Sequence, residues 1–263
     1  MNDQIITSLQ NQKVKDLVSL GAKSSERRKA ELFVVEGLRE CKAAFSAGLS
    51  IDTAFWVPGM AEESFVNSLK AENYIQISSQ VYEKVAYRGT TEGIIATVKY
   101  KALNLDDIKL SDNPLVIVLE SVEKPGNLGA VLRTADAAKV DAVIVCDPLT
   151  DLYNPNTIRS SLGGIFTNQV SACSSEEAYK WLNKNKIQIF TAELQASDWY
   201  HITDMSGPMA IVMGTEANGL TQYWRERADK RIKIPMRGEL DSLNVSVSTA
   251  IICFEALRQR GFN

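Results

Sequence analysis

Apolar positions in the first hundred residues recur with the spacing of alternating short helices and strands. Helical spacing runs from about Ser8 to Leu20 and ends at Gly21, and an apolar run follows at Leu32 to Val35. Further along, the pattern predicts a helix near 38–47, a strand at 54–57, a helix near 62–71, an extended segment at 74–77, a helix from about 79 to 86 and a strand at 93–98. Elements of this length and order indicate a layered α/β domain.

The second half shows a different pattern, in which the strands are continuously apolar. The segment Lys99 to Asn113 is polar and acid-rich and precedes Pro114, so we interpret it as a linker. The run Leu115 to Leu119 is typical of a parallel strand that is buried on both faces, and similar runs lie at 142–146, 187–190 and 209–213. Helical stretches separate these runs, which predicts a parallel sheet with right-handed connections. We therefore place one domain at 1–105 and another at 113–263.

Composition is that of a soluble globular protein, with 45% apolar and 23% charged residues. We expect no membrane contact, because no apolar run approaches the length of a bilayer span. The start of the chain lacks the basic and then apolar pattern of a secretory signal, so a cytoplasmic location is expected. Four scattered cysteines without a CxxC pair fit a reducing compartment.

The chain has a single histidine, His201, and this limits the chemistry. A zinc site built on several histidines is excluded, and the cysteines form no cluster that could replace them, so we expect no metal. A Ser-His-Asp hydrolase would have to use His201, which has no nucleophile-elbow sequence nearby. The reaction is therefore expected to proceed without histidine or metal.

Charge is unevenly distributed, although the net charge of −3 is not that of a typical nucleic-acid binder. Between positions 13 and 29 only two acidic residues stand among six basic ones, Lys13, Lys15, Lys23, Arg27, Arg28 and Lys29. Such a cluster could neutralise several phosphates, or it could be the solvated face of a helix. Charge alone leaves both interpretations open.

Three polar, glycine-containing loops follow strands of the second domain, where open α/β sheets bind ligands. In the first, Pro125-Gly126 makes a turn and Asn127 can cap the following helix, which also carries Arg133. The second spans Gly214 to Thr221 around Glu216, and Leu220 stands where a phosphate loop requires lysine. The third runs from Pro235 to Ser246 into the last helix, where Ser242 and Asn244 are also good capping residues.

Together these segments resemble the three motifs of the SpoU (TrmH) family of SPOUT methyltransferases, in the family's order. The intervening segment Asn156 to Gly164 is similar to the family's sequence between its first two motifs. The first hundred residues resemble the family's L30e-like RNA-binding extension, most clearly at Phe33-Val34-Val35-Glu36-Gly37 after the basic stretch. The resemblance implies a parallel sheet with a deep C-terminal trefoil knot, a homodimer, and S-adenosylmethionine as the methyl donor.

The resemblance also implies roles for individual residues. Gly214, Ile234 and Leu243 should contact the cofactor, with Met236 close by. Asn127 and Arg133 match the family's first-motif pair, with Arg133 as its proposed base. A permanently charged Arg133 that stabilises the developing alkoxide is physically easier, since guanidinium is hardly ever deprotonated in proteins. The remaining catalytic candidates, which would position the ribose and the cofactor, are Glu216, Ser242 and Asn244.

The implied activity is methylation of a ribose 2′-hydroxyl in RNA, with ribosomal RNA expected over transfer RNA. Candidate RNA-binding residues are Lys13, Lys23, Arg27, Arg28 and Lys29. A transfer-RNA methyltransferase and a non-catalytic RNA-binding protein on the same scaffold are the alternatives. A nucleotide-binding oxidoreductase or hydrolase is disfavoured, because its glycine fingerprint and its phosphate loop are missing.

Overall fold

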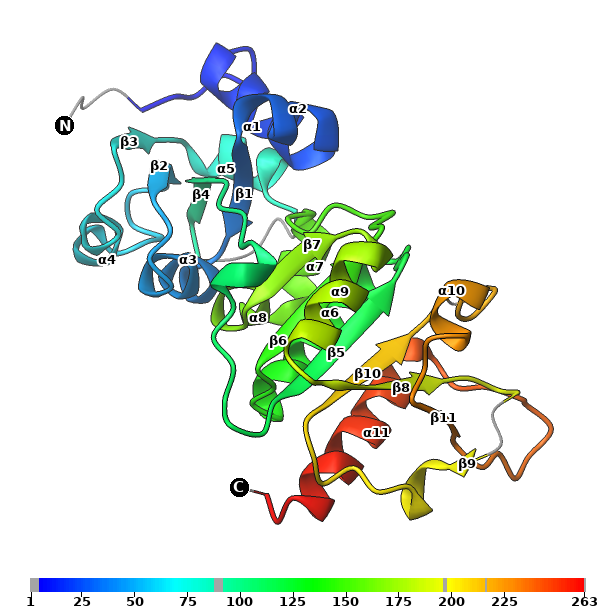
Figure 1. Cartoon of the computed structure of the whole chain (residues 1–263). Coiled ribbons are helices and arrows are strands. Elements are labelled where there is room, and N and C mark those ends of the chain that lie inside the picture. Colours follow the sequence, from blue (N-terminus) through cyan, green and yellow to red (C-terminus); the bar gives the residue numbers. More distant parts are fainter. Residues whose placement is uncertain (1–4, 88–91, 196–197, 216, 263) are drawn as a thin grey trace. The chain divides into compact units, whose positions relative to one another are not determined.

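The computed structural model describes residues 5–87, 92–195, 198–215 and 217–262 (Figure 1). The chain divides into two compact units. The first contains residues 1–101 together with Leu152–Thr167, and the second contains Ala102–Asp151 and 168–263. The segment Leu152–Thr167, which sequence analysis places in the second domain, therefore belongs to the first unit by its contacts.

The first unit is built on a four-stranded mixed sheet in the order β1-β4-β2-β3. Strand β4 pairs antiparallel with both β1 and β2, whereas β3 is parallel to β2. Its elements are α1 (Gln12–Ala22), α2 (Ser24–Ala30), β1 (Leu32–Glu36), α3 (Leu38–Ser46), β2 (Ile51–Trp56), α4 (Glu63–Ser68), β3 (Asn73–Gln76), α5 (Ser79–Val85) and β4 (Ile94–Lys99). The predicted strands and helices are all present, and α2 is an additional helix without apolar periodicity.

Helices α7 (Pro155–Ser161) and α8 (Gly164–Thr167) complete the first unit. An aromatic contact explains why this segment packs here, because the ring of Tyr153 stacks on the buried Phe33 with a centroid distance of 4.0 Å. Phe166 packs against Phe33 as well. Stacked aromatic pairs add to the stability gained from burial alone.

The second unit contains a seven-stranded sheet in the order β7-β6-β5-β10-β8-β11-β9, and every pairing in it is parallel. Its strands are β5 (Leu115–Glu120), β6 (Ala142–Cys146), β7 (Val170–Cys173), β8 (Gln188–Ala192), β9 (Asp198–Trp199), β10 (Met209–Met213) and β11 (Lys230–Lys233). Every residue of β5, β6 and β10 is buried, as the continuous apolar runs predicted.

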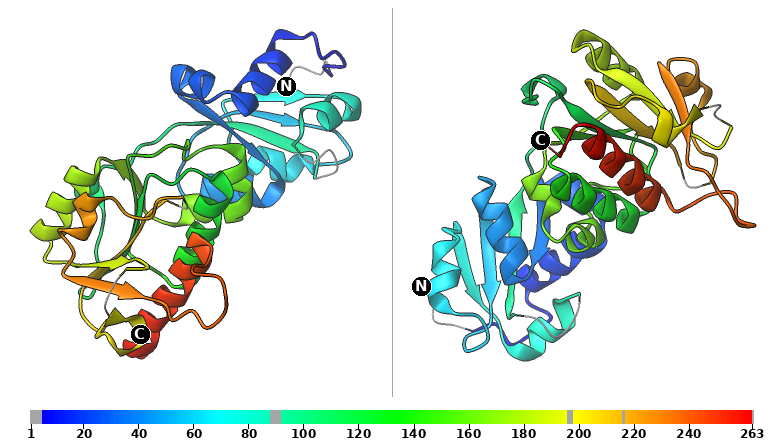
Figure 2. Two further views of the ribbon diagram at one scale, coloured as in Figure 1. Left: turned by 90° about the vertical axis from the view of Figure 1, so that its right-hand side faces the viewer. Right: turned by 90° about the horizontal axis from the view of Figure 1, so that it is seen from below.

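Helices and short 3₁₀ turns lie before, between and after these strands. They are η1 (Leu105–Asp107), α6 (Pro125–Ala137), α9 (Ser175–Lys184), η2 (Tyr200–Ile202), α10 (Gln222–Arg225) and α11 (Val245–Gln259). Helices α6 and α11 lie side by side (Figure 2), while the buried Trp181 of α9 and Trp224 of α10 belong to one core cluster with the sheet. The last helix ends at a glycine in the left-handed region, because Gly261 follows its C-cap Arg260 with a φ of 69°.

The parallel sheet determines where the motif loops meet. Because parallel strands share one carboxyl edge, the loops after β5, β8, β10 and β11 all emerge on the same side. The chain then enters α11, which packs against α6 and β10. The trefoil knot itself stays a prediction. None of the described helices has both the length and the apolar content of a bilayer span.

Candidate active site

A pocket of about 560 Å³ lies at the carboxyl edge of the second unit's sheet. It is formed by the loop after β10, by the long segment between β11 and α11, and by the residues that follow β8. Four residues predicted to contact the cofactor line this one pocket, namely Gly214, Ile234, Met236 and Leu243. These positions are up to 29 residues apart in the sequence, and they meet because they follow strands that end at the same edge of the parallel sheet.

Gly214 occupies a place where the backbone leaves no room for a side chain. A Cβ atom there would lie 2.1 Å from the carbonyl carbon of Gly219 and 2.3 Å from the nitrogen of Leu220. The loop is closed by two backbone hydrogen bonds, from Thr215 N to Gly219 O at 3.1 Å and from Gly219 N to Thr215 O at 3.0 Å. Glycine is therefore required for close backbone approach. The predicted catalytic Glu216 lies outside the described residues.

The first and third motif loops meet through a pair of asparagines. Asn244 Nδ2 donates to Asn127 Oδ1 at 3.1 Å. Asn244 also caps α11, because its Oδ1 accepts from the backbone nitrogen of Ser246 at 2.9 Å. Asn244 therefore both caps α11 and links two of the motif loops. Ser242 Oγ donates to Asp241 Oδ1 at 3.0 Å on the pocket wall.

One expectation about the first motif is corrected. Asn127 is not the cap of α6, since the helix begins at Pro125, a residue favoured at the first helical position, and Asn127 lies inside the first turn. Arg133 is exposed on α6 and, among the described residues, is not one that lines the pocket. Six residues advance a helix by about 9 Å, which carries Arg133 away from the carboxyl edge where Asn127 lies.

An ion-pair cluster around the buried carboxylate of Glu193, which sequence analysis missed, forms part of the pocket wall through Glu193 and Arg225. Glu193, directly after β8, is 9% exposed and accepts from Arg231 Nε at 2.7 Å and Arg231 Nη2 at 3.0 Å. Arg225 Nε lies 3.3 Å from Glu193 Oε2. Burial acts to raise the pKa of Glu193, but hydrogen bonds and charge from Arg231, with help from Thr191 and Arg225, hold the pKa below its ordinary value. The pocket therefore contains a carboxylate that is ionised at neutral pH.

The signal for this cluster was present but weak. Glu193 follows a continuous apolar strand at the same carboxyl edge as the three motif loops. The residues after it, Leu194-Gln195, contain neither glycine nor a small polar turn. The segment therefore lacks the pattern that indicated a binding loop in the three motifs.

The basic cluster of the first unit divides into exposed and buried members. Lys13, Lys23, Arg28 and Lys29 are exposed. Arg27 is only 3% exposed, and its Nη1 donates to the carbonyl oxygens of Leu20 at 2.7 Å and Gly21 at 3.2 Å. These are carbonyls of the last turn of α1, so Arg27 satisfies a helix C-terminus inside the fold.

Comparison with known proteins gives matches over both units. Residues 114–254 match the SpoU rRNA Methylase family, and residues 11–96 match the MRM3-like substrate binding domain. The 23S rRNA (guanosine(2553)-2′-O)-methyltransferase RlmP of Bacillus subtilis is 29% identical over 252 residues, which cover 95% of this chain and 97% of that protein. The 23S rRNA (guanosine-2′-O-)-methyltransferase RlmB of Salmonella typhi is 37% identical over 193 residues, or 71% of this chain and 79% of that protein.

Solved structures agree with these matches. The crystal structure of the AdoMet-bound rRNA methyltransferase from Sinorhizobium meliloti has a TM-score of 0.89 and 28% identity, covering 97% of each chain.

Proposed function

This chain belongs to the SpoU rRNA methylase family and is an S-adenosylmethionine-dependent methyltransferase, and we propose that it methylates the ribose 2′-hydroxyl of a guanosine in 23S ribosomal RNA. The observation that carries the proposal is the convergence of Gly214, Ile234, Met236 and Leu243 on one pocket beside the Asn127–Asn244 pair. RlmP and RlmB, named as guanosine methyltransferases of 23S rRNA, support ribosomal over transfer RNA as the substrate.

The pocket suits the cofactor in size, shape and charge. Its volume of about 560 Å³ lies in the range typical of small-ligand sites. The closed loop at Gly214 presents backbone rather than side chains, and Ile234 and Leu243 supply apolar surface for an adenine ring. The ionised Glu193 favours the positive groups of a sulfonium amino acid.

The bound cofactor would supply an electrophilic methyl group on a sulfonium. The chain's own residues have to hold the ribose oxygen in line with that methyl. We assign this positioning to Ser242 and Asn244, which line the pocket, and to Asn127, which accepts a hydrogen bond from Asn244, with Glu216 as a further candidate. A positively charged Arg133 stabilises the developing alkoxide, because guanidinium retains its proton in proteins.

We propose that Arg133 acts in the pocket of a second copy of the chain. Arg133 is exposed and lies outside the pocket of its own chain. Val247 and Phe254, seven residues apart on one face of α11, are 46% and 42% exposed. An apolar face on α11, which packs beside α6, suits a homodimer interface. In such a dimer α6 of one protomer would deliver Arg133 to its partner.

The two parts of the chain would divide the work. We propose residues 1–105 as the RNA-binding domain and 113–263 as the methyltransferase domain, with Lys13, Lys23, Arg28 and Lys29 as phosphate contacts. Arg27 is left out of this set because its guanidinium is occupied inside the fold. A ribosomal RNA substrate implies a cytoplasmic location. No group of three or more potential metal ligands gathers among the described residues.

Methyl transfer can be measured directly. Unmodified 23S rRNA is incubated with the purified protein and S-adenosylmethionine carrying a labelled methyl group, and the RNA is digested to nucleosides. The proposal predicts label in 2′-O-methylguanosine. Label in a base-methylated nucleoside, or label in transfer RNA alone, would contradict it.

A further inference from the structure

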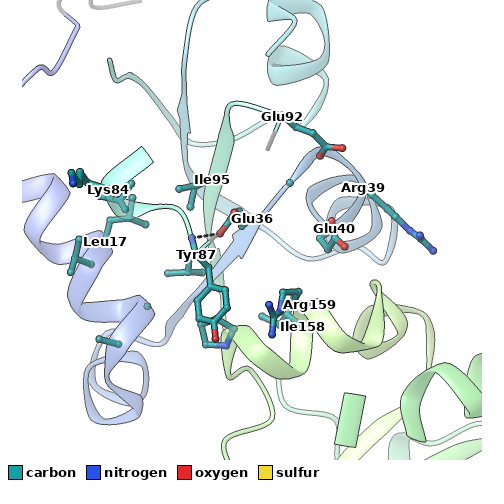
Figure 3. Close-up of a pocket in the computed structure, with 17 residues that line it drawn as sticks. Leu17, Glu36, Arg39, Glu40, Lys84, Tyr87, Glu92, Ile95, Ile158 and Arg159 are labelled. Carbon is teal, nitrogen blue, oxygen red and sulfur yellow. Dashed lines mark hydrogen bonds between the residues drawn. The ribbon is translucent and has the colours of Figure 1, made fainter. Parts of the chain in front are cut away.

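The first unit contains a second pocket, of about 470 Å³, which shares no lining residue with the proposed methyl-transfer site (Figure 3). Its floor is apolar and comes from three elements, with Leu17 on α1, Ile95 on β4 and Ile158 on α7. These three side chains are almost fully buried, at 3%, 1% and 2% exposure. The volume falls in the range of small-ligand sites, and the apolar floor favours a flat, weakly hydrated group.

An exposed aromatic ring stands at this pocket. Tyr87 is 61% exposed, and the guanidinium carbon of Arg159 lies 4.6 Å from its ring centroid. Both partners are held in place, since Tyr87 N donates to Glu36 Oε2 at 2.7 Å and Arg159 Nη2 donates to Asn156 Oδ1. A tyrosine ring and a guanidinium plane are the surfaces on which unpaired nucleobases stack.

Carboxylates gather on another side of the same pocket. Oxygens of Glu40 and Glu92 lie 2.9 Å and 3.2 Å from the position that a Cβ atom would take on Gly37, so both lie over one glycine. Glu92 Oε2 also accepts from the backbone nitrogen of Leu38. Ionised carboxylates only accept hydrogen bonds, and they repel phosphate. The part of a ligand that faces them should therefore carry hydrogen-bond donors, while Lys84 and Arg159 supply positive charge for a phosphate.

We propose that this pocket binds an unpaired guanosine of the RNA substrate. Guanine has two neighbouring donors on its pairing edge, N1–H and the 2-amino group, which match carboxylate acceptors, whereas uracil has one N–H. The base lies on the apolar floor against Tyr87, and its pairing edge faces Glu40 and Glu92. The inference deepens the proposed function, on which it rests, because it names a nucleotide that the RNA-binding unit reads.

The test is a titration of the full chain, with labelled methyl groups, by GMP, AMP, CMP and UMP, followed by NMR. We expect GMP to shift the methyl signals of Leu17, Ile95 and Ile158, and to bind about tenfold more tightly than UMP. Glu40→Gln should weaken GMP binding about tenfold, since it replaces a charged acceptor. Glu83→Gln is the matched control, because Glu83 is exposed on α5 and outside the lining, and it should leave binding unchanged.

Three results would overturn the inference: GMP leaves those methyl signals in place, GMP and UMP bind equally, or Glu40→Gln binds GMP as the unaltered chain does. The same preparations are assayed for methyl transfer to 23S rRNA. Transfer without GMP binding would reject the pocket and keep the proposed function. GMP binding without transfer to any RNA would reject the proposed function and leave a nucleotide site.

Discussion

The two pockets of this molecule are similar in size, about 560 Å³ and 470 Å³, but they are built differently. The pocket of the second unit is shaped by backbone, where loops at the carboxyl edge of a parallel sheet close around Gly214. The pocket of the first unit is shaped by side chains, with a ring, carboxylates and cations on helices and loops around a mixed sheet. The backbone-shaped pocket should lose ligand binding when one methyl group is added at Gly214. The side-chain-shaped pocket should lose ligand binding when one functional group is removed.

The largest effect is expected for Gly214→Ala. The added methyl group would lie far inside the contact distance of the Gly219–Leu220 backbone, so the loop has to open. We expect loss of S-adenosylmethionine binding by calorimetry, while the buried sheet keeps the fold intact by circular dichroism. Gly238→Ala, in the third motif loop, is the matched control, because a Cβ atom there meets nothing within 4 Å. Normal cofactor binding by Gly214→Ala would show that backbone does not shape the pocket.

Arg133→Ala tests whether a side chain from outside the pocket completes it. We expect turnover to fall by about a hundredfold to a thousandfold, as when a transition-state donor is lost, with cofactor binding unchanged. Mixing this variant with Gly214→Ala should restore activity if Arg133 acts in a partner's pocket. Random reassortment makes about half of the dimers mixed, each with one intact site, so about a quarter of normal activity is expected. A mixture as inactive as its parts would place Arg133 in its own chain's reaction.

Glu193→Gln tests the ionised carboxylate in the pocket of the second unit. The change should lower the free energy of unfolding by about 1–2 kcal/mol at pH 7, since Arg231 loses a charged partner but stays partly hydrated. A carboxyl group whose pKa is lower in the folded state stabilises the fold at any pH above its unfolded-state pKa. This stabilisation is lost as the pH falls through the folded-state pKa. The difference between the two proteins should therefore shrink below the ordinary Glu value of 4.5.

Denaturant unfolding at several pH values measures this difference. Glu176→Gln breaks an exposed pair with Lys180 and is the control, for which we expect no measurable change. An equal loss of unfolding free energy in both variants would mean that the buried Glu193 pair stabilises the protein no more than an exposed ion pair does.

The smallest effect on RNA binding is expected at α2, where two neighbouring arginines should behave differently. Arg28→Gln should reduce the salt dependence of RNA binding by about 0.7 in the slope of log K against log salt, with stability unchanged. Arg27→Gln should leave the salt slope unchanged and lower the free energy of unfolding by about 1–3 kcal/mol. The reason is that the Leu20 and Gly21 carbonyls lose their charged donor. Filter binding and thermal unfolding distinguish them. Equal salt slopes for Arg28→Gln and the unaltered chain would remove Arg28 from the RNA surface.

Sequence patterns predicted the elements whose apolar spacing is strong. The continuous runs at 115–119, 142–146 and 209–213 became buried parallel strands, and the motif loops converged where parallel topology requires. The short strands β7 and β9 and the charged helix α2 escaped notice, because each has too few apolar positions to show a period. Tertiary contacts determine the secondary structure of such segments, and the local sequence pattern does not predict those contacts.

Side-chain roles were harder to predict than elements. Arg27 looked like its basic neighbours, and only the fold shows that it turns inward to the carbonyls of α1. The packing of Leu152–Thr167 with the first unit depends on the Phe33–Tyr153 stack, a contact between residues 120 positions apart. Long-range contacts of this kind carry no signal in a single sequence.

The central claim is that the chain places one methyl group on one guanosine ribose of 23S rRNA. The most direct measurement is a ribose-methylation map of total RNA from cells with and without the gene. We predict that cells without it lack a single 2′-O-methyl mark, at a guanosine of 23S rRNA, and that the mark returns with the unaltered gene but not with Arg133→Ala. Identical maps, or a mark lost from transfer RNA instead, would contradict this account.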